Sequence, residues 1–217
     1  MHLLAGSTGF LGNEILRILG VKDISTIALG RRTIPNLPDS VEELIIDFNN
    51  IKTITFPSID HVYLSLGYPL YYQNVMGFMG PTLKKKFFEV DFTYQIEIAK
   101  KAKNVGARSI SLISAVGADS NSWNYYLKTK GMLEEEIIKL EFDNTNIFRP
   151  GHLMGNKKRL DIVLADLMSL IFDPFLHGPL KKFRSISVKK LSKSIVSSSM
   201  DCKTGTSIYE FKDFKNF

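Results

Sequence analysis

The order of apolar and polar positions along the chain predicts strands that alternate with helices. Short apolar runs that suit buried strands lie at residues 3–5, 25–29, 41–46, 61–66, 109–113 and 145–148, and a last run at 207–211 suits an edge strand. Apolar residues at helical spacing follow residue 12 and recur over 87–105, 126–140 and 188–197. This alternation is typical of an α/β fold, a doubly wound parallel sheet with helices on both faces.

A glycine-rich turn joins the first predicted strand to the first predicted helix. Gly6, Gly9 and Gly12 interrupt the apolar pattern, and the last of them opens the helix. In such a turn the first glycine makes the bend, the second lets a pyrophosphate approach the backbone, and the third lets helix and strand pack closely. The helix N-terminus would then face the phosphates with free N–H groups. The sequence therefore predicts a dinucleotide site at the start of the chain.

The ends of the second and third predicted strands carry the residues that would meet the adenosine. Arg31 and Arg32 follow the second strand, where an acid would bind a ribose 2′-hydroxyl and an arginine accommodates a 2′-phosphate. We therefore expect NADP(H) to be preferred over NAD(H), with a solvated arginine turn as the alternative. Asp47 and Phe48 end the third strand, and Asp47 could bind the adenine amino group or serve as a cap.

The fourth predicted strand ends at Leu66 and Gly67, where a missing side chain would leave room for the cofactor. His61 lies at the other end of this strand, so we expect it to be structural. Residues 68–86 are read as a long irregular loop that forms part of the substrate mouth, and the alternative is a mobile surface loop.

Ser114, Tyr126 and Lys130 form a candidate catalytic set. Ser114 ends the fifth strand, and Tyr126 and Lys130 share one helical face because they are four residues apart. A lysine ammonium beside a phenol favours the phenolate, so Tyr126 could exchange a proton while the serine holds the substrate oxygen. Tyr125 competes less well, because Thr129 stands four residues after it. We expect Glu134, Glu135 and Glu136 to be a solvated acidic turn.

Several short motifs resemble the short-chain dehydrogenase/reductase superfamily. They are GSTGFLG at 6–12, GRR at 30–32, SAVGAD at 114–119, YLKTK at 126–130 and FRPG at 148–151. They look most like its atypical branch around the Tat-interacting oxidoreductase, whose members are NADP-binding proteins on a Rossmann fold. The likeness covers roughly residues 1–155.

The resemblance assigns roles to residues of this chain. Ser114, Tyr126 and Lys130 match the catalytic positions of the family, and the segment after the sixth strand would flank the nicotinamide amide. His152 would lie near the chemistry, although a structural loop histidine is the better reading. The cofactor contacts expected from the motifs and strand ends are Gly6, Ser7, Thr8, Gly9, Phe10, Leu11, Gly12, Arg31, Arg32, Asp47, Phe48, Leu66, Gly67, Lys130, Pro150, Gly151 and Leu153.

Length and composition fit one domain, 1–217, in which residues 151–217 contribute substrate-side elements. The net charge of +6 lies in residues 150–217, which hold 12 Lys and Arg against 6 Asp and Glu. A solvated basic face is preferred to a nucleic-acid site. The single cysteine, Cys202, excludes an internal disulfide, and we expect no metal site. With no signal segment before the first strand, we expect a cytoplasmic protein.

The segment 160–172 reads as a helix that is apolar around most of its circumference, with basic residues on both sides. We expect this helix to pack against the core or to form a lid, and contact of 160–176 with a protein or a membrane surface is the alternative. The chain lacks an uninterrupted apolar run of about 18 residues, so we expect no transmembrane span. Monomer and dimer both stay open.

The leading hypothesis is an NADPH-dependent reductase that acts on a small carbonyl or alcohol substrate. Two alternatives remain. One is a non-catalytic NADP(H)-binding regulator that senses the redox state and acts through a protein partner. The other is a nucleotide-sugar epimerase or dehydratase, for which the short region after residue 151 leaves little room.

Overall fold

The computed structural model of this chain describes residues 1–155, 166, 171, 173–201 and 203–216. Within them a parallel sheet has the strand order β3-β2-β1-β4-β5-β6-β9. Its strands are β1 (His2–Ala5), β2 (Thr26–Gly30), β3 (Val41–Ile45), β4 (His61–Leu64), β5 (Ser109–Ile113), β6 (Asn144–Phe148) and β9 (Gly205–Tyr209). All neighbours pair in parallel, and β9 forms an edge, as the sequence predicts. The predicted doubly wound α/β fold is confirmed.

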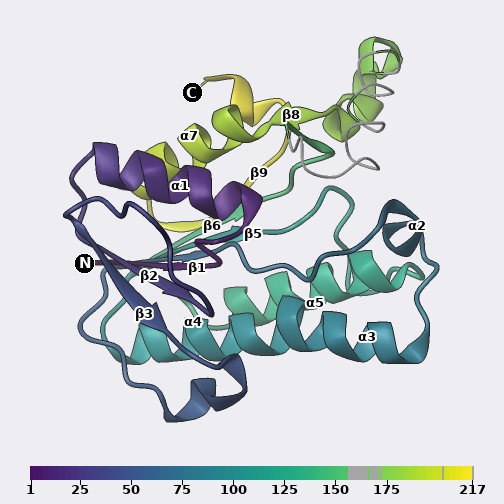
Figure 1. Ribbon diagram of the computed structural model, residues 1–217. Coiled ribbons are helices and arrows are strands. Elements are labelled where there is room, and N and C mark those ends of the chain that lie inside the picture. The colour runs from purple at the N-terminus through teal and green to yellow at the C-terminus, as the bar shows by residue number, and fades with distance from the viewer. Residues whose placement is uncertain (156–165, 167–170, 172, 202, 217) are drawn as a thin grey trace.

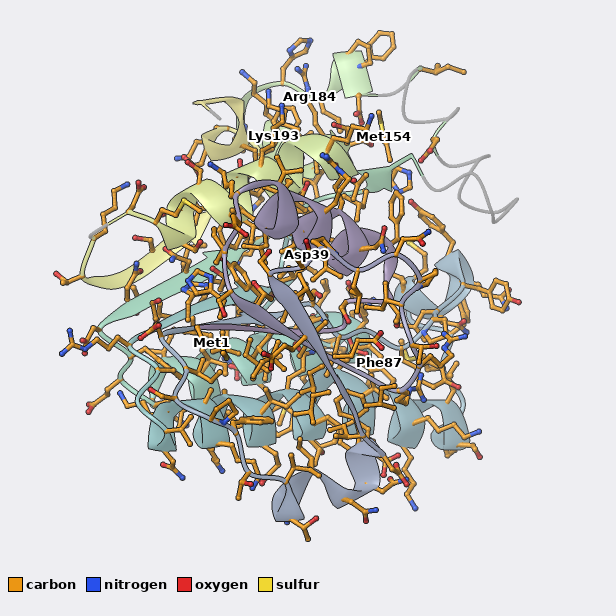
Figure 2. All side chains as sticks on the ribbon, turned by 60° about the vertical axis from the view of Figure 1, so that its left-hand side comes forward. Met1, Asp39, Phe87, Met154, Arg184 and Lys193 are labelled. Carbon is orange, nitrogen blue, oxygen red and sulfur yellow. The ribbon has the colours of Figure 1, made fainter. Side chains whose placement is uncertain are left out.

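Helices cover both faces of the sheet (Figure 1). One face carries α1 (Phe10–Val21) and α7 (Val188–Ser199), and the other carries α3 (Pro81–Phe88), α4 (Tyr94–Asn104) and α5 (Tyr125–Ile138). In Figure 2, Phe87 lies in the layer of α3, α4 and α5, whereas Lys193 lies on α7 across the sheet. The strands therefore present apolar residues on both faces to two hydrophobic cores.

Smaller elements join the layers. The helix α2 (Tyr72–Val75) and the 3-10 helix η1 (Phe48–Thr53) lie in connections on the way to α3. Two short strands, β7 (Leu153–Met154) and β8 (Ile186–Ser187), pair in parallel outside the main sheet. The 3-10 helices η3 (Asp173–Phe175), η4 (Gly178–Phe183) and η5 (Asp213–Asn216) complete the described part of the C-terminal third.

The prediction of one irregular loop over 68–86 is wrong, because α2 and the start of α3 lie within it. Gly80 precedes α3 and Pro81 occupies its first turn, which is a favourable position for proline. A π-helical segment, η2 (Glu89–Thr93), joins α3 to α4. The rings of Phe88 and Phe92 stack on each other with centroids 4.6 Å apart. Both rings are half-buried, and the buried positions of η2 and α4 include Asp91 and Gln95.

The apolar helix predicted over 160–172 falls mostly outside the described residues, as does Cys202. In the described part of the chain, none of the helices has the length and apolar character needed to span a membrane.

A buried polar cluster lies at the amino ends of the central strands. His61 is 1% exposed and hydrogen-bonds Ser109 through Nδ1 (2.5 Å) and Ser111 through Nε2 (3.0 Å). His2 Nδ1 lies 3.2 Å from the Tyr63 hydroxyl. Burial lowers the pKa of His2 to about 4 and lowers the pKa of His61 well below its usual value. Both imidazoles are thus neutral parts of the fold, and the structural role expected for His61 agrees with its contacts.

This cluster predicts a loss of stability in mild acid. Both histidines have a lower pKa in the folded chain than the 6.5 of the unfolded chain, so their contribution is complete above pH 6.5 and is lost as the pH falls toward 4. The free energy of unfolding should decrease by up to about 1.4 kcal/mol per pH unit for each histidine. Urea denaturation at several pH values measures this slope. His61→Asn should roughly halve it, and a flat profile would contradict the assignment.

Candidate functional site

The predicted site residues gather at the carboxyl ends of the parallel strands. The register aligns Ala5 of β1 with Leu64 of β4, and Leu64 with Leu112 of β5. The chain therefore leaves the sheet on the same side, at the carboxyl ends of the strands, in the glycine turn, in the segment after β4 and at Ser114. Ser114 N donates to Phe148 O (2.8 Å), which places the end of β6 beside them. This edge is where ligands bind in open α/β sheets.

The turn between β1 and α1 is packed too tightly for side chains at two of its glycines. Gly6 has φ +92°, and a Cβ there would lie 2.7 Å from the backbone of Ser65. A Cβ on Gly12 would lie 2.1 Å from the Gly6 carbonyl oxygen. The helix begins at Phe10, two residues before the predicted start, so Gly12 lies inside its first turn. Strand, turn and helix thus depend on both glycines.

The N-terminus of α1 is suited to an anion. Gly9 occupies the cap position with no side-chain hydrogen bond to the helix, and no acidic residue stands in the first turn. Thr8 and Gly9 are exposed, whereas Ser7 is fully buried and its hydroxyl has no hydrogen-bond partner among the described residues. Backbone N–H groups and the positive end of the helix dipole therefore remain available to a phosphate.

Helix α5 directs Tyr126 and Lys130 toward a buried acidic residue that the sequence analysis did not single out. Lys130 Nζ lies 2.8 Å from Asp91 Oδ1, and the two side chains are only 6% and 3% exposed. Asp91 also accepts the backbone N–H of Tyr68 (2.7 Å), which follows β4. The pair therefore joins α5, η2 and the exit of β4. A π-helical turn is common at functional sites, and here it carries Asp91.

Lys130 favours the Tyr126 phenolate, as expected, but it does not set the net shift of the Tyr126 pKa. Burial raises the pKa of Tyr126, and Asp91 raises it further, while Lys130 lowers it. The overall shift is upward. Burial alone would lower the pKa of Lys130, but Asp91 and Tyr126 raise it above its usual value. Lys130 is therefore an ammonium already paired with a carboxylate, and Tyr126 is a protonated phenol.

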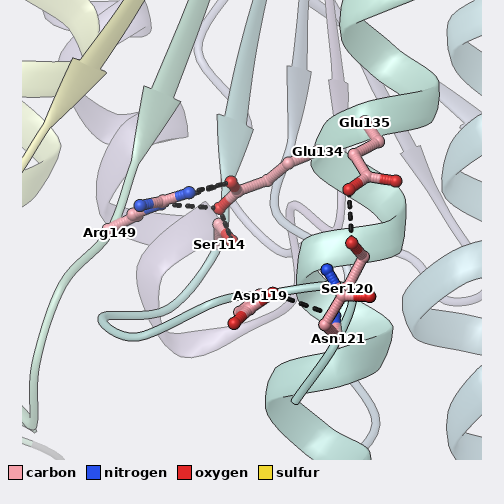
Figure 3. A network of polar contacts seen from close by, with 7 residues as sticks. All are labelled: Ser114, Asp119, Ser120, Asn121, Glu134, Glu135 and Arg149. Atoms are coloured by element: carbon pink, nitrogen blue, oxygen red, sulfur yellow. Dashed lines mark hydrogen bonds and ion pairs between the residues drawn. The ribbon is translucent and has the colours of Figure 1, made fainter.

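Ser114 is held by a second buried pair on the same helix (Figure 3). Its hydroxyl bonds to Glu134 Oε1, and Arg149 bonds both carboxylate oxygens of Glu134, with Nε at 3.0 Å from Oε1 and Nη2 at 2.5 Å from Oε2. Glu134 is 3% exposed, so the prediction of a solvated acidic turn is wrong at this residue. The hydrogen bond to Glu134 raises the pKa of Arg149 above its usual value, against the effect of burial.

The predicted adenosine contacts after β2 are exposed, whereas those after β3 already have partners within the chain. Arg31 and Arg32 are exposed. Asp47 uses its side chain to accept the Asn49 N–H (3.0 Å), so the cap alternative describes its observed contact. Phe48 is 4% exposed, and its ring stacks on Tyr94 with centroids 5.5 Å apart. A cavity of about 410 Å³ opens beside these two rings, between η1 and the α3–α4 helix.

Helix α2 and the segment after β6 approach each other at the carboxyl ends of the strands. His152 Nδ1 lies 2.5 Å from the hydroxyl oxygen of Tyr72, and His152 Nε2 lies 2.5 Å from Asp166 Oδ1. Asp166 also accepts a hydrogen bond from the N–H of Gly155 (2.9 Å). A Cβ added to Gly155 would lie 3.6 Å from the Phe10 ring. The segment after β6 thus contacts both α2 and the glycine turn.

The remaining predicted contacts lie in the connections after β4 and β6. Leu66 O accepts a hydrogen bond from Gln95 (3.3 Å), and Gly67 is exposed. Pro150 is buried, and its carbonyl accepts Val116 N (3.0 Å). Gly151 backs against the carbonyl of Phe183, and Leu153 belongs to β7. In the described part of the chain, no group of three His, Cys, Asp or Glu side chains is placed to hold a metal ion.

The sequence analysis missed Asp91, Glu134 and Arg149 as site residues. Glu134 had one usable signal, since it stands four residues after Lys130 and eight after Tyr126, on the same face of α5. Asp91 had a weaker one, an acid placed between the apolar residues Val90 and Phe92. Arg149 belongs to the FRPG motif at 148–151, but its contact with Glu134 was not predictable because it depends on the packing of β6 against α5.

Curated fungal proteins are similar to this chain. FMP52-2 of Scheffersomyces stipitis is 31% identical over 180 residues, which cover 81% of this chain and 75% of that protein. FMP52 of Candida albicans is 33% identical over 171 residues, covering 71% and 68%. FMP52 of Meyerozyma guilliermondii is 32% identical over 165 residues, covering 72% and 66%, so the chain spans about two thirds of its length. No family model matches the chain.

Solved structures share the fold at low sequence identity. MoeE5 in complex with UDP-glucose and NAD superposes with a TM-score of 0.71 at 13% identity, over 98% of this chain and 79% of that one. Serine dehydrogenase from Escherichia coli gives 0.70 at 14%, over 96% of both chains. Human epimerase family protein SDR39U1 with NADPH gives 0.68 at 16%, over 96% and 73%. The resemblance to atypical short-chain dehydrogenase/reductase proteins is thus confirmed at the level of the fold.

The comparisons correct one expectation. The similar fungal proteins are named mitochondrial, which contradicts the cytoplasmic location expected from the sequence. The chain belongs to the FMP52 family, and it has the Rossmann fold of short-chain dehydrogenase/reductase proteins.

Proposed function

We propose that this chain is an NADPH-dependent oxidoreductase of the short-chain dehydrogenase/reductase type that reduces a small carbonyl substrate. The observation that carries the proposal is the inner face of α5. It places a protonated phenol, Tyr126, one turn before a buried ammonium, Lys130, at the carboxyl edge of a parallel sheet. A proton donor beside a dinucleotide cleft is what carbonyl reduction requires of the protein.

The glycine turn fits the diphosphate of a dinucleotide. The uncapped N-terminus of α1 supplies N–H donors, and the unpaired hydroxyl of Ser7 adds a buried polar group beneath them. Leu66 and Gly67, Pro150, Gly151 and Leu153 would line the remaining length of the cofactor. When bound, the nicotinamide would supply the hydride. MoeE5 with NAD and SDR39U1 with NADPH support a nicotinamide cofactor, and the exposed Arg31 and Arg32 support a 2′-phosphate.

The side chains divide the remaining work. Tyr126 donates its phenolic proton to the substrate oxygen as the carbonyl becomes an alcohol. Lys130 keeps its charge through Asp91 and can stabilise the phenolate that remains, because the two groups interact electrostatically. Ser114 stands at the end of β5 and contacts the substrate oxygen or the phenol. Tyr72 and His152 border the substrate side.

One observation favours a second function, a non-catalytic NADP(H)-binding regulator. Asp91 already holds the Lys130 ammonium in a buried ion pair. Such a protein would bind the cofactor tightly, would reduce no member of a broad carbonyl panel, and would change its affinity for a protein partner with the cofactor's redox state.

Tyr126→Phe should abolish most turnover without weakening cofactor binding. Loss of a positioned general acid typically lowers the rate by about 100-fold or more, whereas the ring and its contact with Phe87 remain. NADPH oxidation measures the rate, and fluorescence titration measures NADPH affinity. Tyr125→Phe is the matched control, because Tyr125 is the adjacent tyrosine and lacks a lysine four residues later. Equal turnover in wild type and Tyr126→Phe would exclude the proton-donor role.

The reductive rate should be nearly independent of pH across the neutral range. Tyr126 must be protonated to donate, and burial together with Asp91 raises its pKa above the usual value of about 10. The acid form therefore persists from pH 6 to about pH 9. Turnover at saturating substrate is the quantity to measure. A rate that falls with an apparent pKa near 7 would show that another group donates the proton.

Replacing both arginines after β2 should change the choice of cofactor. In Arg31→Ala/Arg32→Ala, the affinity for NADPH should fall about 10-fold or more, because charge-assisted contacts to a 2′-phosphate are lost, while NADH affinity should barely change. Arg17→Ala removes one positive charge from the surface of α1, where Arg17 pairs with Glu14, and serves as a control for the effect of a lost arginine outside the proposed site. Parallel losses of NADPH and NADH affinity would refute the 2′-phosphate assignment.

A further inference from the structure

The buried carboxylate of Glu134 holds the hydroxyl of Ser114. Glu134 lies on the same face of α5 as Tyr126 and Lys130, each separated from the next by four residues. Its side chain is 4% exposed and contacts two groups from different strand ends, Ser114 after β5 and Arg149 after β6 (Figure 3). The contact therefore brings a charged pair up to a residue of the candidate catalytic set.

The chemistry of these groups decides which atom donates. A guanidinium has donors only, so two bonds from Arg149 require Glu134 to accept at both oxygens. A carboxylate held in this way carries no hydrogen, and the hydrogen of the Ser114–Glu134 bond must come from the serine. The backbone of Ser114 is fixed by its N–H bond to Phe148 O (2.8 Å), so only the hydroxyl can turn.

We propose that Glu134, clamped by Arg149, is a positioning residue that fixes Ser114 as a hydrogen-bond acceptor toward the cleft. This inference rests on the proposed function. Ser114 then accepts a hydrogen bond from the Tyr126 phenol or from the hydroxyl of the alcohol product. It does not donate to the carbonyl of the substrate, and Tyr126 is the donor to that oxygen. The site thereby recognises the alcohol and carbonyl forms of the substrate through different atoms.

A neighbouring contact offers an internal comparison. Ser120 bonds to Glu135 on the next position of α5, so the same pair of residue types occurs beside the site. Glu135 is exposed, whereas Glu134 is buried and paired with arginine. The Ser120–Glu135 bond therefore already fastens the β5–α5 connection at the surface. The buried Glu134 is not needed for that purpose and can orient Ser114.

The first arm of the test does not need turnover. In a Cys202→Ser background, Ser114→Cys places a thiol in contact with Glu134, and NMR of isotope-labelled cysteine reports its pKa. Burial and the carboxylate should hold this pKa above about 8.5. Adding Glu134→Gln removes the negative charge and leaves the Arg149 guanidinium nearby, so the thiol pKa should fall by at least about one unit. Equal pKa values in the two variants would overturn the proposal.

The second arm measures coupling in the reaction. Glu134→Gln should lower kcat about 10-fold while leaving NADPH affinity unchanged, and it should have no further effect in Ser114→Ala. Glu135→Gln, the matched control, should leave kcat unchanged. A merely structural Glu134 would lower the rate by the same factor with and without Ser114. If no carbonyl is reduced but the thiol pKa shifts, the proposed function fails and the orientation of Ser114 stands. If a carbonyl is reduced, the effects are additive and the thiol pKa does not shift, the proposed function stands and the orientation of Ser114 fails.

Discussion

The buried ion pair between Lys130 and Asp91 is the constraint on which the site depends. Both side chains are almost fully withdrawn from water, and a buried charge that loses its partner is strongly destabilising, typically by about 3–5 kcal/mol. Neither residue can therefore move independently. Asp91 extends the connection to the N–H of Tyr68 after β4, so one pair sets the position of α5 relative to the sheet edge. Tyr126 takes its place one turn earlier on the same helix.

Helix α5 organises the site because it buries charge in matched pairs. Lys130 is neutralised by Asp91 and Glu134 by Arg149, so each cation and anion on its inner face already has a partner. This arrangement has a chemical consequence for Tyr126. Lys130 lowers the pKa of the phenol, but burial outweighs this effect and determines the direction of the shift. The phenol is thereby kept as an acid, which suits donation to a carbonyl oxygen better than abstraction of a proton.

The strands and the glycine turn were predictable from the sequence, whereas the paired charges were not. β1 to β6 differ from the predicted runs by at most two residues at their ends, because strands covered by helices on both faces carry many apolar side chains. Gly6 and Gly12 follow from local sterics. The start of α3 was missed because Lys84, Lys85 and Lys86 obscure its apolar face, although Pro81 marked its beginning. The spacing of Glu134 from Lys130 and Tyr126 places it on their helical face, but its pairing with Arg149 and that of Asp91 with Lys130 depend on tertiary packing, which a local pattern does not reveal.

The central strands carry different buried polar groups at their two ends. At the amino ends, His61 bonds Ser109 and Ser111, and Tyr63 bonds Ser199 (2.6 Å), so neutral groups complete one another. At the carboxyl ends, the first turn of α1 has no side-chain cap and Ser7 leaves its buried hydroxyl unpaired among the described residues. Buried polar groups without partners are uncommon and call for a ligand or water. The buried Lys130–Asp91 and Glu134–Arg149 pairs lie at these same carboxyl ends, beside the glycine turn, whereas the histidine cluster is completed by its own neutral partners and belongs to the fold.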